Sequence, residues 1–88
     1  MKILFEKQFL KDIEAVSEKR LKGQIEILIS EIEKTERLNT LQNLKKMKGH
    51  KSAYRIRLGD YRLGFFYENH TVIFARLLNR KSIYKYFP

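Results

Sequence analysis

The stretch that most constrains the fold is residues 54–67, which read Tyr-Arg-Ile-Arg-Leu-Gly-Asp-Tyr-Arg-Leu-Gly-Phe-Phe-Tyr. Two runs with alternating side-chain character flank the pair Gly59-Asp60, and this pattern is typical of a β-hairpin with a two-residue turn. A turn of that length fixes the register of the two strands. The sequence therefore predicts four cross-strand pairs, which are Leu58 with Tyr61, Arg57 with Arg62, Ile56 with Leu63 and Arg55 with Gly64.

The predicted hairpin has one apolar and one basic face, because successive side chains of a strand point to opposite sides. The apolar face carries Tyr54, Ile56, Leu58, Tyr61, Leu63 and Phe65. The other face carries Arg55, Arg57 and Arg62, and like charges directly opposite one another are destabilising. Guanidinium groups bind phosphates well, so this face indicates an anion site, with room for a ligand at Gly64. The alternative is that the arginines are only the solvated face of an antiparallel sheet.

The rest of the chain predicts a small α+β domain. Residues 3–5 read as a strand, residues 8–19 and 21–34 as two amphipathic helices, and residues 71–78 as a further strand. Residues 35–43 read as a loop, residues 44–49 as a short strand or turn, and residues 79–87 are too few to assign. We expect a single domain over residues 1–88 with the order β-α-α-β-β-β. Two antiparallel helices would pack on one face of a largely antiparallel sheet, and the arginines would lie on the other face.

The positive charge lies in one half of the chain. Residues 1–43 hold eight basic and eight acidic side chains, whereas residues 44–88 hold eleven basic side chains against Asp60 and Glu68, which accounts for the net charge of +9. An uneven basic surface of this kind indicates a nucleic acid, another polyanion or an acidic protein as partner. The chain has no cysteine and no apolar run of membrane-spanning length, so we expect a cytoplasmic protein without a membrane partner.

The sequence also limits the possible chemistry. It contains no glycine-rich phosphate loop, no serine or cysteine nucleophile motif and no metal-ligand spacing, so no metal or cofactor is expected. RNA supplies its own nucleophile, the 2′-hydroxyl, and then needs cations and acid–base groups from the protein. Arg55, Arg57, Arg62 and Arg80 can provide the cations. Tyr84 can stack on a base or move a proton, or it can simply pack the end of the chain.

Several motifs resemble the RelE/ParE superfamily of bacterial toxins from type II toxin–antitoxin modules. They are Leu44-(x)4-Gly49, Tyr54-Arg-Ile-Arg-Leu, Asp60-Tyr-Arg-Leu and Asn79-Arg-Lys-x-x-Tyr84. The resemblance implies a ribosome-dependent mRNA endonuclease that uses 2′-hydroxyl attack without a metal. It also implies a cognate antitoxin, an oligomeric toxin–antitoxin complex, and the ribosome and mRNA as partners. The implied catalytic residues are Arg57, Arg62, Arg80 and Tyr84. The expected phosphate-binding residues are Arg55, Lys45, Lys46, Lys48, Lys51 and Lys81.

This sequence departs from RelE-type toxins at two positions of the hairpin, because it has Arg55 and Arg57 where those toxins have lysines. Arginine stays protonated and is a poor general base, so His50 or Lys51 is an alternative base. Both His50 and His70 also fit ordinary surface turn residues. A ParE-like inhibitor of DNA gyrase without nuclease activity is the alternative function. A member that only binds an antitoxin or RNA is a third.

Overall fold

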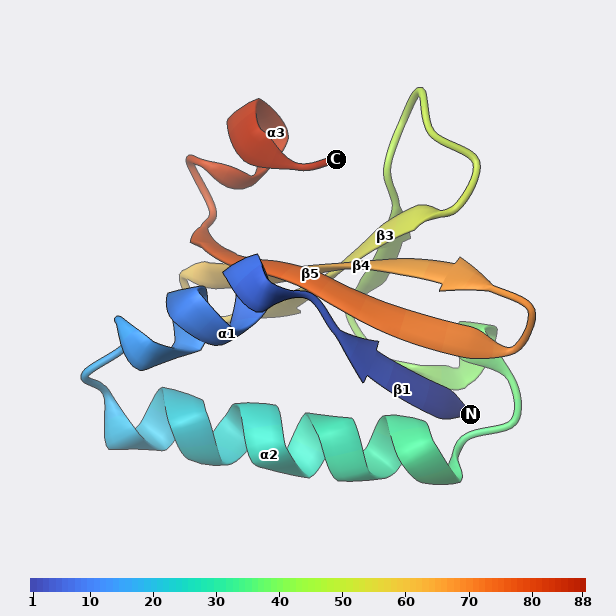
Figure 1. Ribbon diagram of the computed structural model, residues 1–88, viewed down its shortest axis with the longest axis horizontal. Helices are drawn as coiled ribbons and strands as arrows, with labels where there is room; N and C mark the ends of the chain where they lie inside the picture. Colours follow the sequence, from blue (N-terminus) through green and yellow to red (C-terminus); the bar gives the residue numbers. More distant parts are fainter.

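The fold is a five-stranded sheet with its two longer helices against one face, and the computed structural model describes every residue from 1 to 88 (Figure 1). The sheet order is β1-β5-β4-β3-β2, in which β1 runs parallel to β5 and the other neighbours are antiparallel. The predicted α+β class is confirmed, and residues 44–46 add a fifth strand. In chain order the elements are β1 (Lys2–Phe5), α1 (Lys7–Glu14), α2 (Lys19–Lys34), the short 3-10 helix η1 (Leu38–Thr40), β2 (Leu44–Lys46), β3 (Ala53–Leu58), β4 (Tyr61–Glu68), β5 (Thr71–Asn79) and α3 (Ile83–Tyr86).

The boundary between the two long helices differs from the prediction. The first helix ends at Glu14 instead of reaching residue 19, and the second begins at Lys19, so that Gly23 lies inside α2. Val16 is buried although it lies in the connecting segment. Val16 fits the apolar spacing of α1 although it lies beyond the end of the helix, and for this reason the predicted first helix was too long. Likewise, the segment predicted as a loop contains η1, because Leu38 turns inward and is buried.

The β3–β4 hairpin has the predicted register. All four predicted pairs are present, and Arg57 lies directly opposite Arg62. Gly59 adopts a φ angle of 58°, a left-handed conformation that glycine takes at little cost. The β4–β5 turn falls on Asn69 and His70, and both have positive φ angles, which is the pattern of a tight hairpin turn.

The main core lies between the sheet and the helices. Ile25, Leu28 and Ile32 of α2 are buried toward it, and at its centre the ring of Phe74 packs 5.3 Å from that of Phe9, measured between centroids. Ile56, Leu63 and Phe65, on the predicted apolar face of the hairpin, are all at most 1% exposed. This core therefore holds the hairpin from one side and leaves the arginine face available. No helix of the fold is both long enough and apolar enough to cross a membrane.

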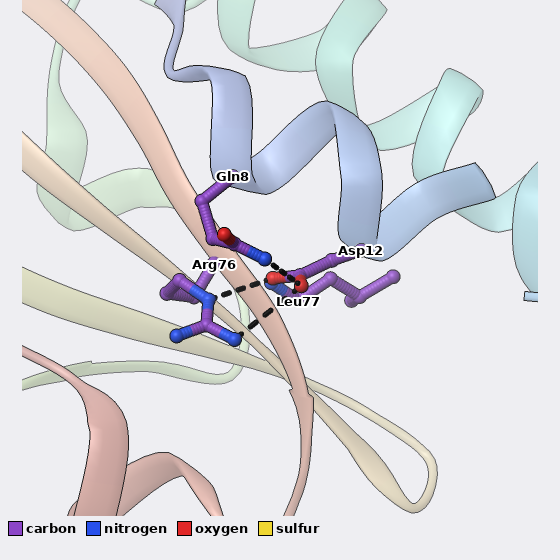
Figure 2. Close-up of polar contacts among 4 residues, drawn as sticks. All are labelled: Gln8, Asp12, Arg76 and Leu77. Atoms are coloured by element: carbon purple, nitrogen blue, oxygen red, sulfur yellow. Dashed lines mark hydrogen bonds and ion pairs between the residues drawn. The ribbon is translucent and has the colours of Figure 1, made fainter. Parts of the chain in front are cut away.

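A partly buried acidic side chain, that of Asp12, joins α1 to β5 (Figure 2). The Asp12 carboxylate accepts hydrogen bonds from the Arg76 Nε at 2.8 Å and from the Leu77 backbone N–H at 2.9 Å. The Gln8 side chain donates a further bond at 3.1 Å. Strand β1 pairs with β5 only as far as Phe74, so Asp12 takes the place of a neighbouring strand beyond that point.

The arginine face of the sheet is partly covered, in contrast to the prediction. Ile83 and Phe87, in and just after α3, are buried there with Met47, Ala53 and Ala75. Phe87 lies directly over Gly64, since a Cβ atom at position 64 would be only 2.7 Å from the Phe87 ring. The predicted ligand space at Gly64 is therefore wrong, because an aromatic side chain of the protein itself fills it. In Figure 1 this terminal segment lies on the side of the sheet away from α2.

Candidate functional site

A basic hollow opens on the uncovered part of the arginine face. Its lining residues come from the segment before β2, from β2 itself and from the hairpin strands, and its volume is about 340 Å³. We call this hollow the arginine groove; it is lined by Asn43, Leu44, Lys45, Arg55, Arg57 and Arg62. The groove lies there because alternate residues of β3 and β4 point to this face while their neighbours enter the core.

Arg57 and Arg62 differ from each other in how the fold holds them. Arg57 is exposed, and its backbone N–H donates to the carbonyl of Asn43, which ties β3 to the start of β2. The Arg62 guanidinium donates from Nη1 to the carbonyl oxygens of Gly59 at 2.8 Å and Tyr61 at 2.9 Å. The hairpin turn thus fixes the position of Arg62 beside the groove.

The positive charges of the arginines act on one another. Partial burial lowers the pKa of Arg62, and the positive charges of Arg55, Arg57 and Arg80 lower it further. Arginine nevertheless remains protonated at neutral pH, because its ordinary pKa is above about 12. A concentrated, fixed positive charge of this kind suits an anion with several oxygens, such as a phosphodiester.

Tyr84 lies at the edge of the arginine groove. Its side chain is 61% exposed, and its hydroxyl accepts a hydrogen bond from the Arg55 Nε at 3.1 Å. The alternative that Tyr84 only packs the chain end is wrong, because Ile83 and Phe87 do that packing. The Arg55 hydrogen bond lowers the pKa of the Tyr84 phenol; burial opposes this effect, whereas the charges of Arg55, Lys45 and Arg62 add to it. The site thus contains a tyrosine that gives up its proton more readily than a free tyrosine does.

A second hollow, which we call the lysine hollow, continues from the first. It has a volume of about 300 Å³, and Lys45 lines both hollows. The hydrogen bond between Arg55 and Tyr84 joins a residue of one hollow to a residue of the other. Three of the predicted phosphate-binding lysines are therefore close to the predicted catalytic tyrosine. The lining residues are Lys45, Lys46, Met47, Lys48, Tyr84, Phe87 and Pro88.

The remaining predicted cations lie around this surface. Arg80 follows β5, its backbone N–H donates to the Asp60 carbonyl, and its charge reaches Arg62. Lys51 and Lys81 are exposed and line neither hollow. Seven of the ten predicted residues therefore line the two hollows, Arg80 lies outside the lining but close enough for its charge to act on Arg62, and Lys51 and Lys81 lie outside it.

His50 makes local contacts, and His70 lies in an exposed turn. His50 Nδ1 accepts the Ser52 backbone N–H at 3.3 Å, and its ring lies 5.4 Å from that of Phe66. His70 belongs to the β4–β5 turn and is exposed. Neither His50 nor Lys51, the two alternative bases, lines the arginine groove or the lysine hollow.

Five residues that line the two hollows were not among the predicted site residues, and they are Asn43, Leu44, Met47, Phe87 and Pro88. Asn43 was treated as part of a loop, but it has a φ angle of 61° and lines the arginine groove. Phe87 was left in an unassigned segment, although it lines the lysine hollow. The four-residue spacing of Ile83 and Phe87 was a signal for a helical turn with one buried side, and Tyr84 lies outside that spacing.

Comparisons with known proteins place this geometry in context. No family model matches the chain. The chain is 45% identical, over 89 residues and the full length of both proteins, to toxin RelE3 of Methanocaldococcus jannaschii. It matches a chain in the crystal structure of a RelB–RelE antitoxin–toxin complex from Methanococcus jannaschii with a TM-score of 0.82 and 42% identity, covering 97% of this chain and 99% of that one. The YoeB dimer of Staphylococcus aureus shares the fold, with a TM-score of 0.74 at 19% identity, over 91% of this chain and 97% of the other.

Proposed function

Since this chain belongs to the RelE family, the toxins of type II toxin–antitoxin systems, we propose that it is an endoribonuclease that cuts mRNA on the ribosome and so inhibits translation. The observation that carries the proposal is the Tyr84 hydroxyl held by Arg55 at the edge of a groove with two further arginines. This arrangement combines a proton acceptor with anion-binding groups. Those are the two requirements for cleaving RNA through its own 2′-hydroxyl.

The proposed reaction begins at the ribose. Tyr84, in its phenolate form, takes the proton of the 2′-hydroxyl, and the 2′-oxygen attacks the adjacent phosphorus. The bond from phosphorus to the 5′-oxygen breaks, which leaves a 2′,3′-cyclic phosphate and a 5′-oxygen that takes a proton from water. The Arg55 hydrogen bond supports this role, because it lowers the pKa of Tyr84 and raises the phenolate fraction at neutral pH. The reaction needs no redox partner.

The arginines would stabilise the transition state. Negative charge builds on the phosphoryl oxygens during the attack, and fixed guanidinium donors are most effective where that charge develops. Arg62 suits this task because the hairpin carbonyls already fix its position. Arg57 and Arg80 would complete the set, and Lys45, Lys46 and Lys48 would hold the backbone of neighbouring nucleotides. Arg55, Lys51 and Lys81 would add further phosphate contacts.

The proposed partners follow from the family and the charge. The relative with the RelB–RelE structure forms an antitoxin–toxin complex. We expect this chain to bind its own antitoxin in an oligomeric complex, through an acidic or amphipathic segment that covers the basic face. Its substrate is mRNA on the ribosome, which would place its action in the cytoplasm.

The test is primer extension on a reporter mRNA in a reconstituted translation reaction. Purified chain should create new 5′ ends within A-site codons, and omitting ribosomes should abolish them. Arg57→Ala and Tyr84→Phe should each reduce cleavage by about 10²-fold or more, since both remove groups that act on the reacting atoms. Arg57 is exposed, so its loss should leave the fold intact.

A matched control is Arg37→Ala, which removes an exposed arginine that lines neither hollow. It should cleave like the original chain. An intact message would refute the nuclease proposal and direct attention to gyrase, with DNA supercoiling as the next assay. Cleavage of naked RNA would support the nuclease activity and refute its dependence on the ribosome.

A further inference from the structure

The helix that carries Tyr84 cannot hold its own position. α3 has only four residues, Ile83–Tyr86, far fewer than an isolated helix needs in water. Tyr84 and Tyr86 are 61% and 55% exposed. Only Ile83 and the following Phe87 are buried, at 0% and 3% exposure. These two side chains therefore decide where the Tyr84 hydroxyl lies.

Phe87 packs on a surface that fits it closely. A Cβ atom at Gly64 would lie 2.7 Å from the Phe87 Cδ2 and 2.9 Å from its Cε2, so only glycine permits this contact. On one side of Phe87 the ring of Phe66 lies 5.2 Å away, between centroids. Phe66 is in turn covered by the ring of His50 at 5.4 Å. The Phe87 ring is thus enclosed below by backbone and on one side by an aromatic pair.

The contact between Phe87 and Gly64 lies next to Arg55 in the sheet. Gly64 is the direct cross-strand partner of Arg55. One strand pair therefore supports both contacts of the terminal segment, with Phe87 on Gly64 and Tyr84 on Arg55. Any movement of Phe87 away from Gly64 would carry α3 with it and lengthen the 3.1 Å hydrogen bond between Tyr84 and Arg55.

We propose that Phe87 and Gly64 act together as positioning residues, which hold the Tyr84 hydroxyl against Arg55. The contact itself is a statement about this fold alone. Its consequence for RNA cleavage rests on the proposed function, because Tyr84 must accept a proton for its position to matter. Phe87 touches no reacting atom and acts only through Tyr84.

The first test measures the position of Tyr84 without any substrate. The pKa of the Tyr84 phenol is followed by NMR of full-length chain with 13Cζ-labelled tyrosine, with Tyr84→Phe used to assign the signal. The charged groups that act on this phenol are Arg55, Lys45 and Arg62. Phe87→Ala should raise the pKa of Tyr84 toward that of free tyrosine, because the Arg55 hydrogen bond is lost. An unchanged pKa in a folded Phe87→Ala chain would overturn the proposal.

Two further variants protect this test against simple unfolding. Gly64→Ala keeps Phe87 but forces its ring to move, so it should raise the Tyr84 pKa in the same direction. Phe87→Leu keeps an apolar anchor and should restore much of the original value. Tyr86→Ala is the matched control, since it removes an exposed ring from the same helix and should leave the Tyr84 pKa unchanged. A shift as large in Tyr86→Ala as in Phe87→Ala would contradict the role of Phe87.

The second test uses cleavage and a double-mutant cycle. Phe87→Ala should slow single-turnover cleavage by about 10²-fold, which is the effect expected when a reacting group is misplaced by about 1 Å. Adding Phe87→Ala to Tyr84→Phe should cost little more than Tyr84→Phe alone, because both changes remove the same contribution. If the double variant slowed cleavage by the product of the two separate fold-reductions, the positioning role of Phe87 would be overturned. If the unaltered chain cuts no RNA, the proposed function fails, whereas the pKa measurements still decide whether Phe87 positions Tyr84.

Discussion

The contacts of Asp12 with β5 allow us to predict how much a substitution would change the free energy of unfolding. Replacing Asp12 with alanine removes the acceptor for the Leu77 N–H and for the Arg76 guanidinium. The Leu77 N–H is then left without a partner in a buried position, which costs about 1–3 kcal/mol. Arg76 loses an ion pair whose side chains are 23% and 9% exposed, but it regains some water, so the additional cost is about 1 kcal/mol.

We therefore expect Asp12→Ala to lower the free energy of unfolding by about 3 kcal/mol. For a domain of this size each kcal/mol corresponds to roughly 4–8 °C in Tm, so the midpoint should fall by about 12–24 °C. Asp12→Asn can still accept the Leu77 N–H through its amide oxygen, and should cost only about 1–2 kcal/mol. The assay is urea and thermal denaturation followed by circular dichroism. Glu14→Ala, an exposed acid on the same helix, is the matched control and should change stability by less than about 0.5 kcal/mol.

The pH dependence provides an independent check. Burial opposes ionisation of Asp12, but the hydrogen bonds from Arg76, Leu77 and Gln8 outweigh it and lower the pKa of the carboxyl. A lowered pKa means that the stabilisation is complete above the unfolded value of about 3.9 and is lost as the pH falls through the folded value. The stability difference between the original chain and Asp12→Asn should therefore narrow in acid. The reasoning would be refuted if Asp12→Ala lost no more stability than Glu14→Ala. It would also be refuted if the stability difference between the original chain and Asp12→Asn did not change with pH.

Three other predictions concern the basic face. The logarithm of the cleavage rate should rise with pH and level off near the lowered pKa of Tyr84, as measured by cleavage rates over a series of pH values. The same rise in Tyr84→Phe would contradict a role of Tyr84 as the base. Arg57→Gln should stabilise the fold by about 0.2–1 kcal/mol at low salt, because it relieves repulsion with Arg62; urea denaturation should show the gain disappearing at high salt, and a destabilised variant would contradict it. Lys46→Ala should reduce the salt slope of RNA binding, measured by fluorescence anisotropy, by about 0.7, whereas an unchanged slope would mean that Lys46 contacts no phosphate.

The sequence was sufficient wherever the determinants are local. Gly59-Asp60 and the alternation around it define the hairpin register, because a side-chain period of two leaves one register that buries Ile56 and Leu63 together. The groove arginines follow directly from that register. The first helix was extended too far because Val16 is buried from a connecting segment, and periodicity cannot distinguish a helical from a non-helical buried residue.

The terminal segment could not be derived in the same way. Whether Gly64 leaves space for a ligand or accepts an aromatic ring depends on Phe87, which is 23 positions away in the sequence. No local pattern reports that distance. The same holds for Tyr84, whose hydrogen bond to Arg55 spans 29 positions. The residue types of the site were therefore predictable, whereas the contacts that select a role for Tyr84 required the fold.

The distribution of charge and packing explains how this small domain tolerates its site. Three arginines close together on one hairpin oppose folding, and the pKa of Arg62 is lowered by its partial burial and, in addition, by the neighbouring positive charges. The main core lies on the other side of the same strands, where Ile56 and Leu63 are almost fully buried. Because side chains alternate, the hydrophobic gain of one face offsets the repulsion of the other without any acidic side chain in the groove. An acid placed there would neutralise the arginines and stabilise the fold, but it would also compete with a phosphate for the same donors.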